Sequence, residues 1–364
     1  MIDWAHAQNV LCIRLDNLGD VLMTTPAIRA VKHARPGRRV TLLASKAGAQ
    51  AARHVPEIDD VIAYDAPWVK HEHDAGRAID LEMIETLRKQ RFDAAIIFTV
   101  YTQTALPAAM MCRLAGIPLR LAHSRENPYR LLSDWVAESE PQQLVRHEVE
   151  RQLDLVAAIG CTTQERRLSF RVTTDDRRRV VARLAKLGID ASRPWILMHP
   201  GATAASRRYP VEQFAQAARG IAEQLDCPVV FGGTSNERNL VNEVRARMGA
   251  ASYSLAGELN LGECAAAISL ARVLVSNNSG PVHIAAALNT PVVDLYALTN
   301  PQHTPWLVRS HVLSHDVPCK YCFKSVCPEG HHDCLRKVAP QEVVDACLAL
   351  FEPKRTVMPL VPVE

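Results

Sequence analysis

The sequence predicts an α/β protein built from two doubly wound parallel sheets, one in each of two domains. Three observations lead to this prediction. Short apolar runs alternate with stretches of helical period, this alternation occurs twice with a less regular region between, and the 364 residues suffice for two domains. Repeated strand–helix units of this kind form parallel sheets that helices cover on both faces.

In the first half, each apolar run bounded by turn residues predicts a strand, and each apolar pattern of helical spacing predicts a helix. The expected strands are 10–15, 40–44, 60–64, 94–100 and 119–122, and the expected helices are 21–33, a segment ending near 53, 78–90 and 104–115. Residues 124–174 are less regular and contain one clear helix, near 147–159. We place the connection within 162–193 and assign residues 1–175 to an N-terminal domain and 176–364 to a C-terminal domain.

The alternation restarts after the connection. The expected strands are 195–199, 228–231, 273–276 and 292–296, the last of these being the final strand of the chain. The expected helices are 211–225, 237–248, 261–271, 282–288 and 340–351. Because ligands of doubly wound sheets bind beyond the carboxyl ends of the strands, the candidate binding loops are 16–20, 200–208, 232–236, 277–283 and 297–305.

Composition excludes several classes of protein. The hydrophobic share of 48% argues against intrinsic disorder, and a net charge of +3 from 42 basic and 39 acidic residues is too even for a dedicated nucleic-acid coat. No run of about 18 apolar residues predicts a spanning helix. The first residues lack the pattern of a secretory signal, so we expect a cytoplasmic protein with no nucleic-acid partner.

The loop 276–283 places serine, asparagine and glycine between a strand and a helix. Free backbone N–H groups at a helix N-terminus form an anion site, and Pro281 suits the first helical turn. His283 would lie in that turn, near a bound phosphate. A simple Ser/Asn cap with a surface histidine fits the same spacing. No Gly-x-Gly-x-x-Gly follows the first strand and no Walker motif occurs, which disfavours a dinucleotide oxidoreductase and a nucleotide hydrolase.

A second candidate loop follows the strand at 195–199. Gly201 permits close approach of a ligand, Thr203 offers a hydroxyl, and Arg207 with Arg208 supply cations suited to phosphate. Taken alone, this segment also fits a surface loop with solvated arginines. The glycine-rich loop at 232–235 is of the same kind, and the three loops together favour a nucleoside diphosphate bound to the C-terminal domain.

Asp20 follows Gly19 where a helix begins, at the candidate cleft. A carboxylate at this place is able to take a proton from an alcohol. Aspartate is equally favoured as a helix cap, where it satisfies free N–H groups and the helix dipole. Asp16 has the same two interpretations, and the residues alone favour capping.

Two further clusters have both a structural and a functional interpretation. Arg113, Arg120, Arg125 and Arg130 form a basic run that is either a solvated face or a dock for an anionic acceptor, with contact to a membrane surface. Cysteines cluster within residues 319–334, and their density predicts a structural zinc site, with free thiols as the alternative. The ligands of such a zinc site would be Cys319, Cys322, Cys327 and Cys334.

Several of these segments together resemble glycosyltransferase family 9, the ADP-heptose:lipopolysaccharide heptosyltransferases. Residues 14–27, RLDNLGDVLMTTPA, are similar to the opening motif of the family. The segment His199-Pro200-Gly201 with residues 207–210 resembles its donor loop, and residues 277–287 resemble its phosphate loop. The segment 322–334 resembles a tail found in many members.

The resemblance implies the GT-B architecture, in which two Rossmann-like domains face a cleft with the acceptor in the first and the nucleotide-sugar donor in the second. It implies inverting transfer of a heptose from an ADP-sugar to a lipid-linked core oligosaccharide, without a catalytic cofactor or metal. Asp20 matches the general base of the family, which reverses the capping interpretation. The positions that match its donor-binding residues are Thr203, Arg207, Ser279, Gly280 and His283, and the adenine is expected near Leu259.

The chain departs from the family pattern near the donor. We also assign Asn278 to the donor site, and many members have aspartate at this position. Other members have lysine in place of Arg207. The glycine-rich loop lacks its usual carboxylate, although Glu237 is close. These departures leave three alternatives open: transfer from another nucleotide sugar to another glycan, a sugar-nucleotide epimerase, and a non-catalytic nucleotide-sugar binder on the same architecture.

Overall fold

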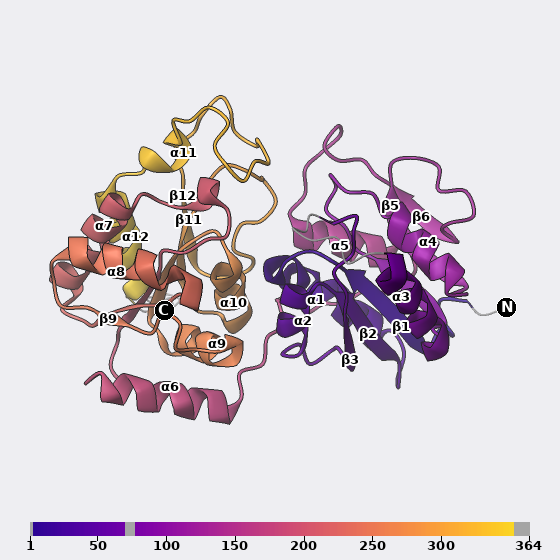
Figure 1. The fold of residues 1–364 in the computed structure, drawn as a ribbon, viewed down its shortest axis with the longest axis horizontal. Helices are drawn as coiled ribbons and strands as arrows, with labels where there is room; N and C mark the ends of the chain where they lie inside the picture. Colours follow the sequence, from indigo (N-terminus) through magenta and orange to yellow (C-terminus); the bar gives the residue numbers. More distant parts are fainter. Residues whose placement is uncertain (1–2, 70–76, 353–364) are drawn as a thin grey trace, which may run out of the picture.

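The computed structural model describes residues 3–69 and 77–352, and these form two lobes that lie side by side (Figure 1). Each lobe contains one six-stranded sheet in which every strand is parallel to its neighbours. Helices pack on both faces of each sheet, so the predicted α/β class and the two doubly wound sheets are confirmed.

The first lobe contains six strands in the order β3-β2-β1-β4-β5-β6. The strands are β1 (Asn9–Arg14), β2 (Arg39–Ala44), β3 (Asp60–Ala63), β4 (Ala94–Ile97), β5 (Leu119–Ser124) and β6 (Asp134–Ala137). The helices are α1 (Leu18–His33), α2 (Lys46–Ala52), α3 (Arg77–Gln90), α4 (Leu106–Leu114) and α5 (Glu148–Ala157).

The second lobe repeats this topology, with the order β12-β11-β10-β7-β8-β9. Its strands are β7 (Ile196–His199), β8 (Val229–Phe231), β9 (Tyr253–Ser254), β10 (Val273–Asn277), β11 (Val292–Leu295) and β12 (Ser310–Leu313). Its α-helices are α6 (Thr174–Lys186), α7 (Val211–Leu225), α8 (Arg238–Met248), α9 (Leu261–Leu270), α10 (Gly280–Leu288), α11 (Asp333–Arg336) and α12 (Pro340–Phe351). Two 3₁₀ turns, Ala205–Arg207 and Ser235–Glu237, follow β7 and β8.

The strands are nearly continuous apolar runs because both faces of each sheet are covered. In β1 and β10 almost every residue is buried. One core cluster fills the side of the first sheet under α1 and α5 and continues into the second lobe under α9 and α10. The two remaining clusters lie on the outer faces, under α3 and α4 in one lobe and under α7, α8 and α12 in the other.

The expectation that 292–296 is the final strand was wrong, because β12 pairs in parallel with β11. The segment Ser310–Leu313 contains two polar residues and is half-exposed at the sheet edge, so it lacks the apolar run of a buried strand. The predicted connection also contains an unexpected helix, α6, which has only Val180 and Leu184 buried. We keep the domain division at residues 175 and 176 as a proposal, supported by the packing of α5 on α1 and of α6 on α9.

None of the helices in the described ranges has the length and apolar character needed to cross a bilayer.

Candidate active site between the lobes

In both sheets the strand order reverses at one point, between β1 and β4 in the first lobe and between β7 and β10 in the second. Crevices outside the carboxyl ends of strands at such points are where doubly wound sheets bind ligands. The loop after β1 carries Asp20, the loop after β7 carries Thr203 and Arg207, and the loop after β10 begins at Asn278. The predicted catalytic and donor-binding residues, except Leu259, thus lie at the two switch points.

The two lobes meet where the N-terminus of α1 faces that of α10 (Figure 1). A Cβ added to Gly19 would lie 2.6 Å from Cδ2 of His283, and a Cβ added to Gly280 would lie 3.1 Å from Cδ2 of Leu18. Only glycine permits so close an approach at position 19 without displacing the histidine. The predicted base and the predicted phosphate loop are therefore in direct juxtaposition.

Asp20 lies in the first turn of α1 and is almost fully buried. Its Oδ2 accepts a hydrogen bond from Asn17 N (3.1 Å), whereas its Oδ1 lies 3.3 Å from Nη2 of Arg14. Burial acts to raise the pKa of Asp20. Arg14, together with the two nearby histidines and the hydrogen bond from Asn17, acts in the opposite direction, and the pKa lies below its ordinary value. Asp20 is thus an ionised carboxylate that also caps its helix, so both sequence interpretations describe it.

Arg14 at the end of β1 is completely buried among three carboxylates. Its Nη1 lies 2.7 Å from Oε1 of Glu148 and its Nε lies 3.0 Å from Oδ2 of Asp16, in addition to the contact with Asp20. Burial raises the pKa of Asp16 to about 6, against the lowering effect of Arg14. Nothing in the sequence indicates the contribution of Glu148, because this residue begins α5 and meets Arg14 only in the folded chain.

The N-terminus of α10 is built on a buried hydrogen-bond network. Asn278 Nδ2 donates to Oδ2 of Asp294 (2.8 Å) and to the backbone oxygen of His303 (3.0 Å). Ser279 is the N-cap of α10 and donates from Oγ to the backbone oxygen of Asn277 (3.1 Å). Burial raises the pKa of Asp294 to about 8, so this carboxyl group is mainly protonated at neutral pH.

His283 is buried in the first turn of α10, and its Nδ1 has no hydrogen-bond partner among the described residues. Burial lowers the pKa of this imidazole to about 3, so the ring is neutral. An unpaired polar atom in a buried position costs free energy unless a ligand or water satisfies it. His283 therefore has unused hydrogen-bonding capacity at the end of the helix where a phosphate is expected.

Arg207 is half-buried in the 3₁₀ turn after β7. Its guanidinium makes no hydrogen bond or ion pair with the described residues. Its charge acts to lower the pKa values of His283 on α10 and of Asp294 on β11, so both lie within its electrostatic range. Thr203 in the same loop is exposed. This loop therefore brings an uncompensated cation toward the N-terminus of α10.

The other two predicted donor elements are the glycine-rich loop after β8 and Leu259. Glu237 accepts hydrogen bonds from N and Oγ1 of Thr234, and its Oε2 lies 3.8 Å from Nε2 of His199. A Cβ at Gly201 would overlap Oε1 of Glu237 at 1.9 Å, so the two loops touch. Leu259 lies in the loop before α9, half-buried against the core.

The four predicted acceptor arginines differ in their surroundings. Arg120 is buried, and its guanidinium donates to the backbone oxygens of Ile117, Pro118, Arg130 and Leu131. Arg113, Arg125 and Arg130 are exposed, and each of the first two makes one or two hydrogen bonds to backbone oxygens. The acceptor role of this run stays a prediction.

The predicted zinc site is not supported. The described residues contain no group of three or more histidine, cysteine or acidic side chains that is arranged to hold a metal ion. Cys319, Cys322, Cys327 and Cys334 are free thiols, each half-exposed. Their segment instead packs against the donor loop, since Ser206 N and Oγ donate to the backbone oxygens of Ser325 (3.0 Å) and Lys324 (2.7 Å). The other three thiols lie near enough to act on the pKa of Cys334, but spacing along the chain does not fix the directions in which thiols point, and no three described side chains are arranged around one metal position.

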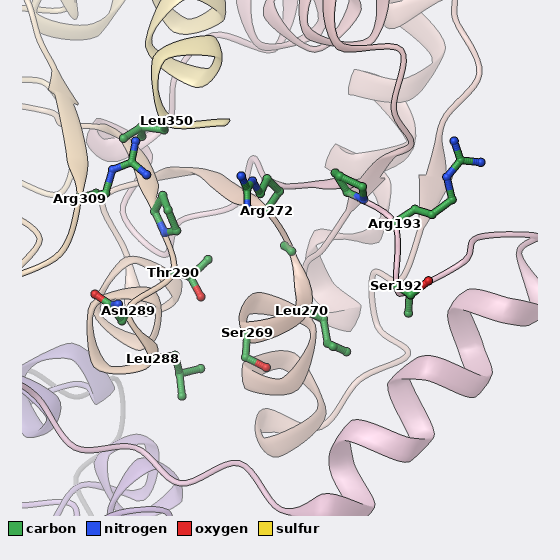
Figure 2. A pocket seen from close by; sticks show the side chains of 14 residues that line it. Ser192, Arg193, Ser269, Leu270, Arg272, Leu288, Asn289, Thr290, Arg309 and Leu350 are labelled. Atoms are coloured by element: carbon green, nitrogen blue, oxygen red, sulfur yellow. The ribbon is translucent and has the colours of Figure 1, made fainter. Parts of the chain in front are cut away.

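A cavity of about 370 Å³ lies at the amino-terminal ends of the strands of the second sheet, away from the ends that carry the donor loops (Figure 2). Its lining includes Arg193, Arg272 and Arg309, and the last two donate to backbone oxygens at the C-terminal end of α12. This cavity is separate from the switch-point loops.

Two Rossmann-like lobes that bring a carboxylate, a cation and a helix N-terminus together at their switch points have the arrangement of a nucleotide-sugar transferase of the GT-B type. The family model for glycosyltransferase family 9 (heptosyltransferase) matches residues 81–332. The chain belongs to glycosyltransferase family 9. It is therefore a glycosyltransferase, and neither the epimerase nor the non-catalytic alternative is favoured.

The comparisons with individual proteins agree with this assignment. The chain is 25% identical over 356 residues to lipopolysaccharide heptosyltransferase 2 of Escherichia coli K12, covering 94% of this chain and 98% of the relative. The crystal structure of a family 9 glycosyltransferase from Veillonella parvula has a TM-score of 0.81 at 21% identity, with 96% and 98% of the two chains covered. The structure of E. coli ADP-heptose LPS heptosyltransferase II has a TM-score of 0.73 at 24% identity, with 94% and 98% covered. These likenesses confirm the predicted GT-B fold.

Proposed function

We propose that this glycosyltransferase moves a heptose from ADP-heptose to a hydroxyl of a lipopolysaccharide core acceptor. The names of the matched relatives support the donor and the acceptor class. The observation that carries the proposal is the juxtaposition of Asp20 with the N-terminus of α10 across the lobe boundary, because transfer needs a base for the acceptor beside a site for the leaving diphosphate.

In the proposed donor complex, the diphosphate binds at the N-terminus of α10. Backbone N–H groups at Ser279 and Gly280, together with the guanidinium of Arg207, would neutralise its charge. His283 would donate a ring N–H to the same anion, or accept with a ring lone pair from a hydroxyl of the sugar. The exposed hydroxyl of Thr203 and the half-buried side chain of Leu259 would contact the remainder of the nucleotide.

The proposed chemistry is a direct displacement. Asp20 takes the proton of the acceptor hydroxyl as that oxygen forms a bond to the anomeric carbon of the heptose. The bond between this carbon and the phosphate oxygen breaks, and ADP leaves with the bonding electron pair. Because the acceptor attacks the face opposite the leaving group, the configuration is inverted. Arg207 and the end of α10 stabilise the charge that gathers on the leaving group, and removal of one such donor typically lowers the rate by about 10²–10³.

The acceptor is lipid-linked in this proposal, so a cytoplasmic enzyme would meet it at the inner face of the inner membrane. Exposed Arg113, Arg125 and Arg130 are cations on the acceptor-side lobe. Anionic groups of the core oligosaccharide or of the membrane surface would pair with them.

The test is transfer by the purified full chain, offered ADP-heptose, UDP-sugars or GDP-sugars with a core acceptor that lacks the terminal heptose. We expect release of ADP with one heptose added to the acceptor, seen by mass spectrometry, and little transfer from the other donors. The variant R207A should lose about 10²–10³ in rate, whereas R208A, which alters the neighbouring exposed cation, should lose far less. Transfer only from a different nucleotide sugar would refute the proposal.

A further inference from the structure

A loop that follows β11 in the second lobe packs against the first lobe. It comprises residues 299–306 and is here called the interlobe loop. Gln302 in this loop is completely buried against the first lobe. Its Nε2 donates to Oε2 of Glu140 (3.1 Å) and to the backbone oxygen of Arg146 (2.9 Å), and its own backbone oxygen accepts from Glu148 N (3.1 Å). The interlobe loop therefore caps the N-terminus of α5.

Three more contacts fix the far end of the interlobe loop. His147 Nε2 lies 2.9 Å from the backbone oxygen of Thr304, and the rings of His147 and Trp306 stack with centroids 4.5 Å apart. Trp306 Nε1 donates to the backbone oxygen of Arg166 (2.7 Å). Because the loop belongs to the second lobe and all these partners belong to the first part of the chain, its docking depends on how the lobes are arranged.

The docked loop carries His303 to the predicted base. His303 Nε2 lies 3.9 Å from Oδ1 of Asp20, and the two side chains are only 12% and 11% exposed. The backbone of His303 is held by Asn278 Nδ2 at its oxygen and by Tyr296 Oη, 3.3 Å away, at its nitrogen. The backbone N–H of Glu148 donates to Gln302, and the side chain of Glu148 binds Arg14. One network therefore positions both His303 and Asp20.

The same nitrogen of His303 lies 3.5 Å from Nδ2 of Asn300. An amide nitrogen only donates, so this contact favours the tautomer in which Nε2 carries a lone pair. Burial lowers the pKa of His303, which keeps the ring neutral before the reaction. A neutral imidazole is a stronger base than a carboxylate by about 2–3 pKa units in ordinary surroundings.

We propose that His303 receives the proton that Asp20 takes from the acceptor, so that the two lobes jointly assemble a proton-transfer pair when the interlobe loop is docked. This inference rests on the proposed function. The Oδ1–H bond of Asp20 breaks, a bond forms between that proton and Nε2 of His303, and Asp20 returns to its carboxylate form. The resulting imidazolium is stabilised by the carboxylate, and its proton passes to water when the lobes separate. His303 acts through Asp20 and does not touch the sugar.

The surroundings of His303 contain charges of both signs. Anions favour its protonated form and cations oppose it, so the balance of these charges sets the pKa of His303. The titratable groups that face it from the packed elements are Asp20 and Arg14 in the first lobe, Glu148 and His147 at α5, His283 at α10, and Arg207 in the donor loop.

The first experiment needs no sugar. The pKa of His303 is measured by NMR on the full chain with labelled histidine, in the wild type and in D20N. Loss of a neighbouring carboxylate should lower the pKa of His303 by about 1–3 units. An unchanged pKa of His303 would show that the pair does not form in solution and would overturn the proposal.

The second experiment measures the pH dependence of kcat and the KM for the donor in the wild type, H303Q and H303A. In the wild type, kcat should fall on the acid side as His303 becomes protonated. H303Q should lose this limb, its kcat should drop by about 10–100-fold at neutral pH, and its KM should change less than twofold. Added imidazole should restore part of the activity of H303A. The control H311Q replaces an exposed histidine on β12 and should behave as the wild type.

The outcomes distinguish this inference from the proposed function. If the wild type transfers heptose but H303Q keeps the acid limb, or imidazole does not rescue H303A, His303 has only a structural role and the inference fails. If the wild type rejects ADP-heptose while D20N lowers the pKa of His303, the proposed donor is wrong and the pair is upheld.

Discussion

Replacement of Asp20 separates its two tasks, the capping of α1 and the acceptance of a proton. Asp20 Oδ2 accepts from Asn17 N, whereas Oδ1 faces Arg14 and His303. In D20N an amide oxygen remains to accept the capping bond, but the group is no longer a base. In D20A both tasks are lost.

The magnitudes of the two losses differ. Loss of a helix cap costs about 1 kcal/mol, which lowers Tm by roughly 2–4 °C in a domain of this size. Arg14 keeps Asp16 and Glu148 as partners, so its charge stays compensated in either variant. Loss of a general base lowers the rate by about 10²–10⁴, or about 2.7–5.4 kcal/mol in the activation free energy. D20N should therefore be nearly as stable as the wild type and yet almost inactive.

The assay is turnover at saturating donor and acceptor, together with ADP affinity by calorimetry and Tm by scanning calorimetry. ADP affinity should be retained in D20N, because the groups proposed to bind the diphosphate, Arg207 and the N-terminus of α10, are unchanged. D176A is the matched control, since Asp176 occupies the same capping position in α6 and lies away from the site. Equal losses of turnover in D20A and D176A, or near-normal turnover in D20N, would refute the assignment of Asp20 as base.

Four further predictions follow from the geometry. G19A should lower kcat/KM tenfold or more with an unchanged Tm, because its Cβ would lie 2.6 Å from His283 and keep the lobes apart; normal kinetics would contradict this. N278D should lower Tm by several degrees, since it loses two buried hydrogen bonds, to Asp294 and His303, at about 1–3 kcal/mol each. In the wild type, the pKa of Asp294 is raised from 3.8 to about 8, so its contribution to stability is lost as the pH rises from 4 to 8. D294N should therefore raise Tm at pH 8 more than at pH 5, and equal changes would refute the raised pKa. Transfer should persist in excess EDTA, because the proposed stabilisation of the leaving group comes from protein groups.

Most of the fold was predictable because a buried parallel strand carries its signal locally. The strand after residue 9 and the helix at 211–225 appear almost as expected, since each is an apolar run or an amphipathic stretch. The missed elements have weak apolar signals. β12 is a half-exposed edge strand, and α6 is strongly charged and buries only two residues.

The site was predictable only in part, for a physical reason. Asp20 and the phosphate loop follow strands directly, so the sequence places them at the carboxyl edges of their sheets. Arg14 meets Glu148 only when the first lobe folds, and His303 approaches Asp20 only when the two lobes are arranged. No local pattern relates Gln302 to Glu148, although the hydrogen bond between their backbones helps to hold His303 beside Asp20.

The Asn278 departure shows how such contacts change the meaning of a residue. Judged from the sequence alone, asparagine at this position removes a carboxylate from the donor site. In the structure its amide donates to the buried carboxyl of Asp294 and to the backbone of His303, which a carboxylate at position 278 is unable to do. Two carboxylates there would also repel each other in a site closed to water. Asn278 is therefore matched to the carboxyl group of Asp294, and the same amide also holds the backbone of His303 in the interlobe loop.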